Sequence, residues 1–292
     1  MHIPVLQEEA IEYLNPKPNE NFIDGTFGEG GHAAAILRNN IPDGKVLGIE
    51  ADGKLYEIMK LLNEGTLNRL TLVNDSYTNL KEIVERHNFR PVNGVLLDLG
   101  ISKWHLEESG RGFSFQKNEP LDMRFFAQGR LSAEMILNYW PENEIEKILR
   151  EYGEERFSRR IAQKIAEVRQ RQPIKSTFQL VEIIKNAVPF RYKKNNHFPA
   201  KTFQAVRIAV NGELENIKKV LPIGLEILEK EGRLAVISFH SLEDRIVKTF
   251  FKENAKQGKL KIINKKPIVP SFKEVEQNPS SKSAKLRVGL KI

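Results

Sequence analysis

Short apolar runs alternate with longer amphipathic segments in the first and last parts of the chain. Each run is rich in β-branched residues or leucine and is bounded by turn residues, which predicts a buried strand. Strands that alternate with helices favour a parallel sheet, so we expect an α/β fold. The predicted strands are Phe22–Asp24, Val46–Glu50, Leu70–Val73, Val92–Asp98, Arg233–Phe239, Leu260–Ile263 and Ala284–Val288, and a helix from about Phe203 to Leu228 precedes the fifth.

The middle of the chain has a different period. From Leu131 to about Val188, apolar residues recur at helical spacing, which predicts an all-helical insertion with its own packed core. We expect the core domain to comprise residues 1–125 and 203–292, and the insertion to comprise residues 126–202. The polar segment Lys273–Lys282 is expected to be a mobile loop. The predicted apolar stripes are Ile145, Ile148, Leu149 and Tyr152; Ile161, Ile165 and Val168; and Phe178, Val181 and Ile184.

A glycine-dense turn follows the first strand. Gly25, Gly28, Gly30 and Gly31 lack a Cβ, so backbone amides in this turn can lie against a ligand. The run Ala33–Leu37 then predicts a helix whose N-terminus favours an anionic group. A turn that merely connects a strand to a helix is the alternative interpretation.

The second strand narrows the choice of ligand. It ends at Glu50, which follows Asp24 by 26 residues, close to the roughly 20-residue step between a glycine turn and a ribose-binding acid. The glycines, however, are spaced G-x-x-G-x-G-G, whereas a pyrophosphate-binding turn has G-x-G-x-x-G. The pattern therefore favours an adenosine cofactor without a pyrophosphate, with S-adenosylmethionine as the leading candidate.

Two further strand ends carry reactive side chains. Asp98 ends the fourth strand and is expected to face the same crevice as Gly28 and Glu50, since ligands bind beyond the carboxyl ends of parallel strands. A helix-capping aspartate is the alternative. After the fifth strand, polar residues crowd the segment His240–Arg245, where Ser241 and Asp244 are spaced like a capping box, so a helix start is the alternative there.

Composition excludes several classes of protein. The 292 residues, 40% of them hydrophobic, are enough for one large domain with an insertion or for two domains. The chain has no apolar run of membrane-spanning length, and Met1–Val5 lacks the layout of a signal peptide, so we expect a soluble, cytoplasmic protein. The absence of cysteine and the scattered histidines argue against a zinc enzyme, and no metal site is predicted.

The charge of the chain points to a polyanionic partner. A net charge of +8 and a pI near 9.4 are typical of nucleic-acid-binding proteins, although an unspecialised basic surface gives the same values. Seven basic residues between Arg156 and Lys175 are expected on one helical segment. The alternative is that they form i,i+4 ion pairs with neighbours such as Glu155 and solvate a helix face. The candidate RNA contacts are Arg156, Arg159, Arg160, Lys164, Arg191, Lys193 and Lys194.

Several motifs, spread in order over essentially the whole chain, together resemble one family, the bacterial 16S rRNA (cytosine-N4)-methyltransferases. The combination of the motif at 24–32 with the motif at 238–245 is specific to that family. The motifs are D-G-T-F-G-E-G-G-H at 24–32, D-L-G-I-S at 98–102, R-G-F-S-F at 111–115, P-L-D-M-R at 120–124, Y-G-E-E-R at 152–156, K-T-F-Q-A at 201–205 with Arg207 and Asn211, S-F-H-S-L-E-D-R at 238–245 and S-A-K-L-R at 283–287.

The resemblance implies a class I (Rossmann-like) S-adenosylmethionine-dependent methyltransferase core with an inserted all-helical domain for substrate recognition. It implies methyl transfer from S-adenosylmethionine to the exocyclic N4 of a decoding-site cytosine in 16S rRNA, within the small ribosomal subunit. Glu50 and Tyr77 stand where the family usually has aspartate and phenylalanine, and His105 replaces a glutamine with a titratable ring. The implied cofactor-binding residues are Gly30, Gly31, His32, Glu50, Tyr77, Asp98 and His105.

The chemistry of the reaction adds a catalytic residue. The N4 amine of cytosine shares its lone pair with the ring, so an acceptor must hold its N–H while the methyl donor is aligned behind it. Asp98 and the carbonyl of Leu99 are the candidates. A base within folded RNA must also be splayed out to enter the crevice.

Two other functions share some of these features. An NAD-dependent oxidoreductase would share the arrangement of Asp24 and Glu50, and a non-catalytic RNA-binding or assembly protein would share the basic helices. Calorimetric titration with S-adenosylmethionine, S-adenosylhomocysteine and NAD separates all three. The sequence leaves the oligomeric state, a homodimer included, open.

Overall fold

The computed structural model describes residues 4–63, 65, 68–127, 129–194 and 197–292. The chain forms two compact units, a sheet unit of residues 1–100 and 214–292 and a helical unit of residues 101–213. The helical unit is wider than the predicted insertion of 126–202, because Phe113, Leu121 and Met123 pack into the core of the helices. Residues 1–3, part of the segment used above to argue against a signal peptide, lie outside the described residues.

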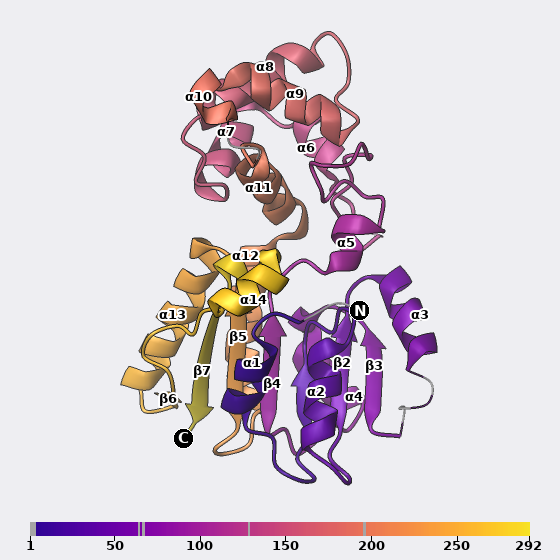
Figure 1. Ribbon diagram of the computed structural model, residues 1–292, viewed down its shortest axis with the longest axis vertical. Coiled ribbons are helices and arrows are strands. Elements are labelled where there is room, and N and C mark those ends of the chain that lie inside the picture. Colours follow the sequence, from indigo (N-terminus) through magenta and orange to yellow (C-terminus); the bar gives the residue numbers. More distant parts are fainter. Residues whose placement is uncertain (1–3, 64, 66–67, 128, 195–196) are drawn as a thin grey trace. The chain divides into compact units, whose positions relative to one another are not determined.

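The sheet unit contains one seven-stranded sheet with the order β3-β2-β1-β4-β5-β7-β6 (Figure 1). The first five strands are parallel, and β7 pairs antiparallel with both β5 and β6. This topology confirms the predicted Rossmann-like α/β fold. The strands are β1 (Phe22–Asp24), β2 (Val46–Glu50), β3 (Leu70–Asn74), β4 (Gly94–Asp98), β5 (Arg233–Ser238), β6 (Leu260–Ile262) and β7 (Lys285–Lys291).

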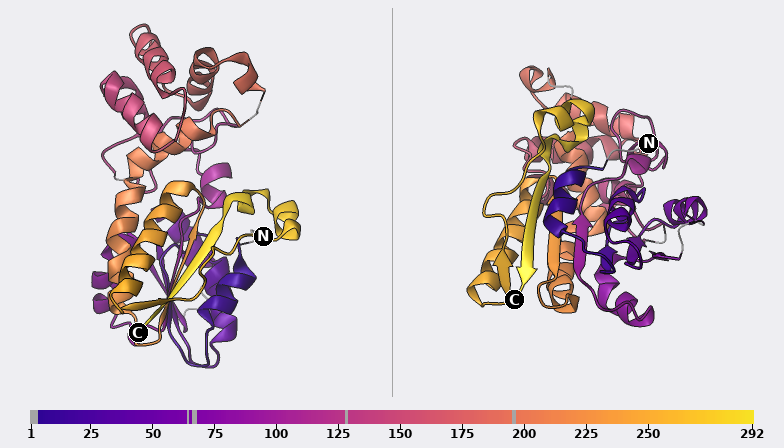
Figure 2. Two further views of the ribbon diagram at one scale, coloured as in Figure 1. Left: turned by 90° about the vertical axis from the view of Figure 1, so that its left-hand side faces the viewer. Right: turned by 60° about the horizontal axis from the view of Figure 1, so that its bottom comes forward.

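Helices cover both faces of this sheet. In the left view of Figure 2, α12 (Glu213–Ile227) and α13 (Ser241–Lys256) lie on one face, and α1 (Gln7–Leu14) and α2 (Gly31–Asn39) lie on the other. Side chains from α12, α13 and the strands share one large apolar core. The other elements of the sheet unit are α3 (Gly53–Leu62), η2 (Tyr77–Asn79), α4 (Leu80–Arg86), α14 (Phe272–Gln277) and η3 (Pro279–Ser283).

Two sequence predictions in this part of the chain are wrong. The single helix expected from Phe203 to Leu228 is broken at Gly212, whose φ of 62° ends α11 in the left-handed region. The expected loop at Lys273–Lys282 contains α14 and η3. The side chain of Ser271 caps α14. The S-x-x-E pattern of residues 271–274 therefore indicates a helix start, although the polar composition of the segment suggested a loop.

The helical unit has a separate apolar core, as the change of period predicted. Its third predicted stripe is partly wrong: Ile184 is buried as predicted, but Phe178 is 48% exposed and Val181 is half-buried. Helix α9 also buries Leu180, Ile183 and Ala187. The helices are α5 (Lys103–Glu107), α6 (Ala133–Tyr139), α7 (Glu142–Glu151), α8 (Ser158–Arg169), α9 (Thr177–Ala187), α10 (Phe190–Lys193) and α11 (Ala200–Asn211).

Among the residues that the structure describes, none of the helices combines the length and the apolar character needed to cross a bilayer.

Candidate active site

Three acids end neighbouring parallel strands of the sheet unit. Asp24 ends β1, Glu50 ends β2 and Asp98 ends β4, and β1 pairs with both of the other strands. Parallel strands present their carboxyl ends at one edge of the sheet, where open α/β folds bind ligands. The backbone N–H of Asp98 donates to Thr26 Oγ1 at 2.6 Å, which ties β4 to the glycine turn after β1.

Glu50 supports the glycine turn from the neighbouring strand. Its buried carboxylate accepts hydrogen bonds from the backbone N–H of Gly28 at 2.9 Å and from that of Asp52 at 2.8 Å. A carboxylate offers about four acceptor positions. Glu50 therefore fixes the glycine turn from β2.

The glycines of the turn are needed for its own packing. Gly30 has a φ of 76°, and a Cβ there would lie 2.7 Å from Cζ of Phe27. A Cβ on Gly31 would collide with Pro4. The fold itself therefore requires glycine at these two positions, and close approach of a ligand to the turn stays a prediction. Helix α2 begins at Gly31, two positions before the predicted start.

His32 lies in the first turn of α2, next to Asp98. Its Nε2 is 3.4 Å from Asp98 Oδ2, and its ring is buried. Burial disfavours the charged ring, but attraction to Asp98 and Asp24 outweighs it and raises the pKa of His32 above its usual range. Neither ring nitrogen makes a hydrogen bond of good geometry within the described residues, so a polar ligand group can be accommodated here.

Asp24 is a third member of this charged cluster that the sequence analysis did not assign. Its carboxyl is fully buried and accepts a hydrogen bond from the backbone N–H of Thr26 at 3.2 Å. Burial raises its pKa to about 6, although the charge of His32 opposes the shift. Its Oδ2 has no partner within the described residues. The sequence indicated this residue only by its position, since Asp24 ends a predicted strand beside the strands that end at Glu50 and Asp98.

We expect the Asp24 carboxyl to make stability depend on pH. The pKa of this carboxyl is near 3.8 in the unfolded chain and about 6 in the folded protein. Between pH 3.8 and about pH 6, the folded protein therefore binds the carboxyl proton more tightly than the unfolded chain does. The free energy of unfolding should therefore fall as pH rises through that window, by roughly 3 kcal/mol. Asp24→Asn lacks this titration, so its stability relative to wild type should rise between pH 4 and pH 7 in urea unfolding.

Asp75→Asn is the matched control for that experiment. Hydrogen bonds from Asn79, Ser76 and Arg86 outweigh burial and lower the pKa of Asp75. Its contribution is fully present above its ordinary pKa of 3.8 and is lost only as pH falls below that value, so the stability of this variant relative to wild type should stay nearly constant between pH 4 and pH 7. A flat pH profile for Asp24→Asn relative to wild type would show that Asp24 does not titrate in this window.

The alternative of a helix-capping role for Asp98 is wrong. Ser102 caps the following helix α5, with its hydroxyl accepting from the N–H of His105. Oδ1 of Asp98 instead accepts from the backbone N–H of Gly100 at 3.0 Å, which leaves Oδ2 beside His32. Asp98 is thus held at the strand end by the loop itself.

The remaining predicted cofactor residues lie in different units. Tyr77 begins η2 in the sheet unit, and a Cβ on Gly25 would lie 3.7 Å from its Cβ, so it adjoins the start of the glycine turn. His105 belongs to the helical unit, where it is buried with its Nδ1 2.6 Å from Ser102 Oγ. The rings of Trp104, Phe113 and Phe125 surround it at centroid distances of 5.0 to 5.1 Å. A cofactor contact for His105 stays a prediction.

The polar segment after β5 mainly starts a helix. The capping box of α13 is formed by His240 and Glu243, not by Ser241 and Asp244 as their spacing suggested. Asp244 instead forms an ion pair with Arg287, whose Nε lies 2.6 Å from Asp244 Oδ1. Two of the sequence motifs therefore meet to hold α13 against β7.

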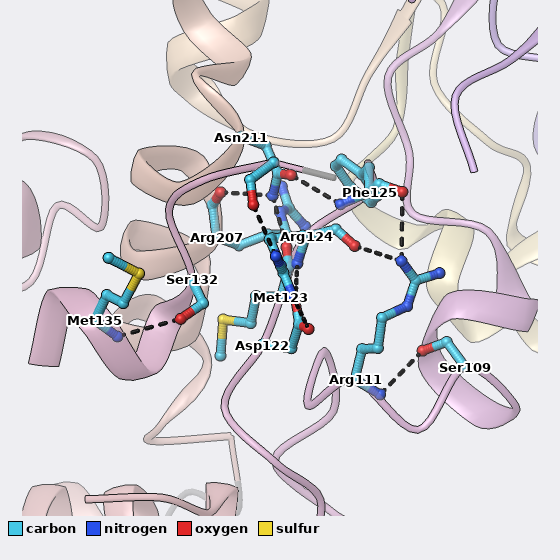
Figure 3. A network of polar contacts seen from close by, with 11 residues as sticks. Ser109, Arg111, Asp122, Met123, Arg124, Phe125, Ser132, Met135, Arg207 and Asn211 are labelled. Atoms are coloured by element: carbon cyan, nitrogen blue, oxygen red, sulfur yellow. Dashed lines mark hydrogen bonds and ion pairs between the residues drawn. The ribbon is translucent and has the colours of Figure 1, made fainter. Parts of the chain in front are cut away.

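Other motifs converge on a polar network in the helical unit (Figure 3). Asn211 on α11 donates to the carbonyl of Met123 and accepts from the N–H of Phe125, both within 2.9 Å. Arg111 donates to the carbonyl of Arg124 at 2.7 Å. These bonds hold the long segment before α6 on α11, which gives the motifs at 111–115 and 120–124 a structural role.

The basic residues do not share one helix. Arg159, Arg160, Lys164 and Arg169 lie on α8, whereas Arg156 precedes it and Arg171 and Lys175 follow it. Arg169 donates to the carbonyls of Leu137 and Trp140, so it joins α8 to α6 and the residue after it.

The predicted pairing of the basic residues with Glu155 is wrong. Glu155 is buried and accepts from the N–H of Phe157 and the hydroxyl of Tyr192. Lys164 pairs with Glu167 at 2.8 Å. Arg159 and Arg160 are exposed and form no ion pair with any described residue. Their charges are available to a polyanion.

Comparison with known proteins gives a consistent result. The profile of the MraW methylase family matches residues 1–292. A Heliobacterium mobile protein named Ribosomal RNA small subunit methyltransferase H is 46% identical over 308 residues, which cover 100% of this chain and 99% of that protein. Proteins of the same name from Thermosipho africanus and Kosmotoga olearia are 44% and 43% identical, and the matches cover 100% of this chain and 98% and 97% of theirs.

Proposed function

Because this chain belongs to the MraW methylase family, we propose that it is an enzyme that transfers a methyl group from S-adenosylmethionine to small-subunit rRNA. The observation that carries the proposal is the cluster at the strand ends, where Asp98 lies beside His32 and Glu50 supports the glycine turn. A non-catalytic RNA-binding protein has no use for buried charges at this edge of a sheet.

The polar groups of the cluster suit this cofactor. When bound, S-adenosylmethionine supplies an electrophilic methyl group on a sulfonium. The buried His32 ring and the Oδ2 atom of Asp24 have unused hydrogen-bonding capacity that a polar methionine end can take up. Glu50 would hold the ribose, and Tyr77 would cover the adenine. Gly30, Gly31 and Asp98 would line the same site, with His105 as a further proposed contact.

We propose the exocyclic N4 of a decoding-site cytosine in 16S rRNA as the methyl acceptor. Asp98 accepts the N–H of this amine, since its Oδ2 faces the site beside His32 and its Oδ1 is fixed by Gly100. The carbonyl of Leu99 is the second acceptor, and the N–H of Leu99 is anchored on the carbonyl of Ile237 at 2.9 Å. Orientation of the amine and the methyl donor contributes the larger share of the rate enhancement, since it lowers the barrier by roughly 7 to 11 kcal/mol. Proton transfer contributes a factor of about 10² to 10⁴ in rate.

The helical unit is proposed to recognise the rRNA. Arg159 and Arg160 on α8, with Arg156 and the basic residues of α10, present positive charge on its surface. Phosphate contacts of this kind supply affinity without reading sequence. Lys164 contributes less, because Glu167 already neutralises it.

The function is tested by binding and by product analysis. Calorimetric titration should detect S-adenosylmethionine and S-adenosylhomocysteine but not NAD. Mass spectrometry should show that rRNA from a deletion strain lacks a methyl group on one cytosine. Restoring the gene should restore that methyl group. Binding of NAD alone would favour an oxidoreductase, and an unchanged rRNA mass would contradict the assignment.

We expect Glu50→Gln to weaken S-adenosylmethionine binding by about 1 kcal/mol, roughly fivefold, since hydrogen bonds to a charged acceptor are stronger by about that amount. Glu50→Asp is the matched control, because it keeps the carboxylate and should bind more tightly than the glutamine variant. Calorimetry measures both. Equal affinities for wild type and Glu50→Gln would remove Glu50 from the ribose site.

A further inference from the structure

The short helix α10 has one half-buried aromatic residue and one exposed aromatic residue. Tyr192 donates from its hydroxyl to Glu155 Oε2 at 2.8 Å, and its ring packs edge-on against Phe157 at a centroid distance of 5.0 Å. Burial and the hydrogen bond with Glu155 raise the pKa of Tyr192 to about 12, so it remains a donor. Phe190, in contrast, is 73% exposed.

The helical geometry explains why these two residues differ. Successive residues of a helix are rotated by about 100°, so Phe190 and Tyr192 lie roughly 200° apart, on opposite sides of α10. Lys194, four positions after Phe190, lies on the same side as it does. Its Nζ is 5.8 Å from the centroid of the Phe190 ring. Tyr192 thus anchors the helix and leaves Phe190 and Lys194 facing outward.

Several basic residues lie on or next to α10. Arg191 and Lys194 are exposed, Lys193 is half-buried, and none of them forms an ion pair with a described residue. The guanidinium of Arg156 lies over the rings of Phe157 and Tyr192, at 4.6 and 4.9 Å from their centroids, and so adjoins the same helix. Glu155, the acid that contacts α10, is buried and bonded to Tyr192.

An exposed aromatic ring among unpaired cations matches the chemistry of a single-stranded nucleic acid. Bases stack on aromatic rings, and phosphates take the adjacent charges. Paired RNA keeps its base faces stacked inside the helix, so the ring selects an unpaired segment. We propose that Phe190 is a stacking platform for an unpaired base of the rRNA substrate, with Arg191 and Lys194 on the flanking phosphates. This proposal rests on the proposed function.

Stacking and charge can be separated by salt dependence. Phe190→Ala should weaken binding to in-vitro-transcribed 16S rRNA at least about fivefold, without changing the slope of affinity against salt, because no phosphate contact is lost. Phe190→Trp should bind within about twofold of wild type and show fluorescence quenching on RNA addition. Lys194→Glu should flatten the slope. Phe272→Ala, which removes an 86% exposed ring from the sheet unit, is the control and should change neither.

The outcomes distinguish this proposal from the function on which it rests. If wild type methylates the rRNA and Phe190→Ala binds it as tightly as wild type, the stacking proposal fails while the function stands, and a protein partner for the ring becomes the better interpretation. An unquenched Phe190→Trp would equally overturn stacking. If wild type neither binds nor methylates rRNA, the proposed function itself fails. Thermal unfolding and circular dichroism like those of wild type show that each variant is folded.

Discussion

Asp98→Ala is expected to slow methyl transfer to rRNA by at least about 10²-fold. Asp98 ends β4, and its carboxylate is positioned by the N–H of Gly100 on one oxygen and by His32 on the other. Removing it takes away the proposed acceptor for the amine N–H and leaves the raised-pKa His32 without its nearest carboxylate. Single-turnover rates at saturating S-adenosylmethionine measure the effect on chemistry alone.

Cofactor affinity decides which role Asp98 has. If Asp98→Ala binds S-adenosylmethionine as wild type does while the rate falls, Asp98 acts on the amine. If affinity falls in parallel with the rate, it is mainly a cofactor ligand. Asp75→Asn is a matched control, since Asp75 directly follows β3 at the same edge of the sheet but was assigned no role. An unchanged single-turnover rate for Asp98→Ala would refute the catalytic assignment.

The strands were predictable because buried parallel strands have an unambiguous pattern. Runs such as Val46–Glu50 are buried on both faces and bounded by turn residues, so their side chains alone define them. The helices after residue 200 were harder. Gly212 ends α11 by adopting a left-handed backbone, and the periodicity of the apolar residues continues on both sides of it. Such a break depends on backbone geometry that the periodicity does not record.

The candidate site was predictable in its topology and not in its electrostatics. Once a parallel sheet is inferred, Glu50 and Asp98 must lie at the same edge. The raised pKa of Asp24 was not accessible from the sequence, because it follows from complete burial, with a smaller contribution from Asp98 and against the opposing charge of His32. Burial of a strand-end acid depends on what packs above it, here the turn and the start of α2. The ion pair of Asp244 with Arg287 was not predictable either, because its partners are far apart in sequence and meet only in the folded chain.

Reversing charge at α8 is expected to weaken rRNA binding by roughly 20-fold near physiological salt, through loss of two phosphate contacts. The variant is Arg159→Glu with Arg160→Glu. Both side chains are exposed, and within the described part of the chain neither has an acidic partner that would already neutralise it. The log-log slope of affinity against salt should flatten by about 1.4 to 1.8. Filter binding at several salt concentrations measures both quantities.

The double variant Arg150→Glu with Lys185→Glu is the control for net charge. It makes the same change in charge on the same unit, but Arg150 pairs with Glu146 and Glu151, and Lys185 pairs with Glu182 at 3.1 Å. Cations that are already paired release fewer counterions from RNA, so this variant should alter the slope less. Lys164→Glu should resemble the control, because Glu167 lies 2.8 Å from its ammonium. Equal slopes for the α8 variant and wild type, with both folded, would remove α8 from the RNA interface and leave Arg159 and Arg160 as solvated residues.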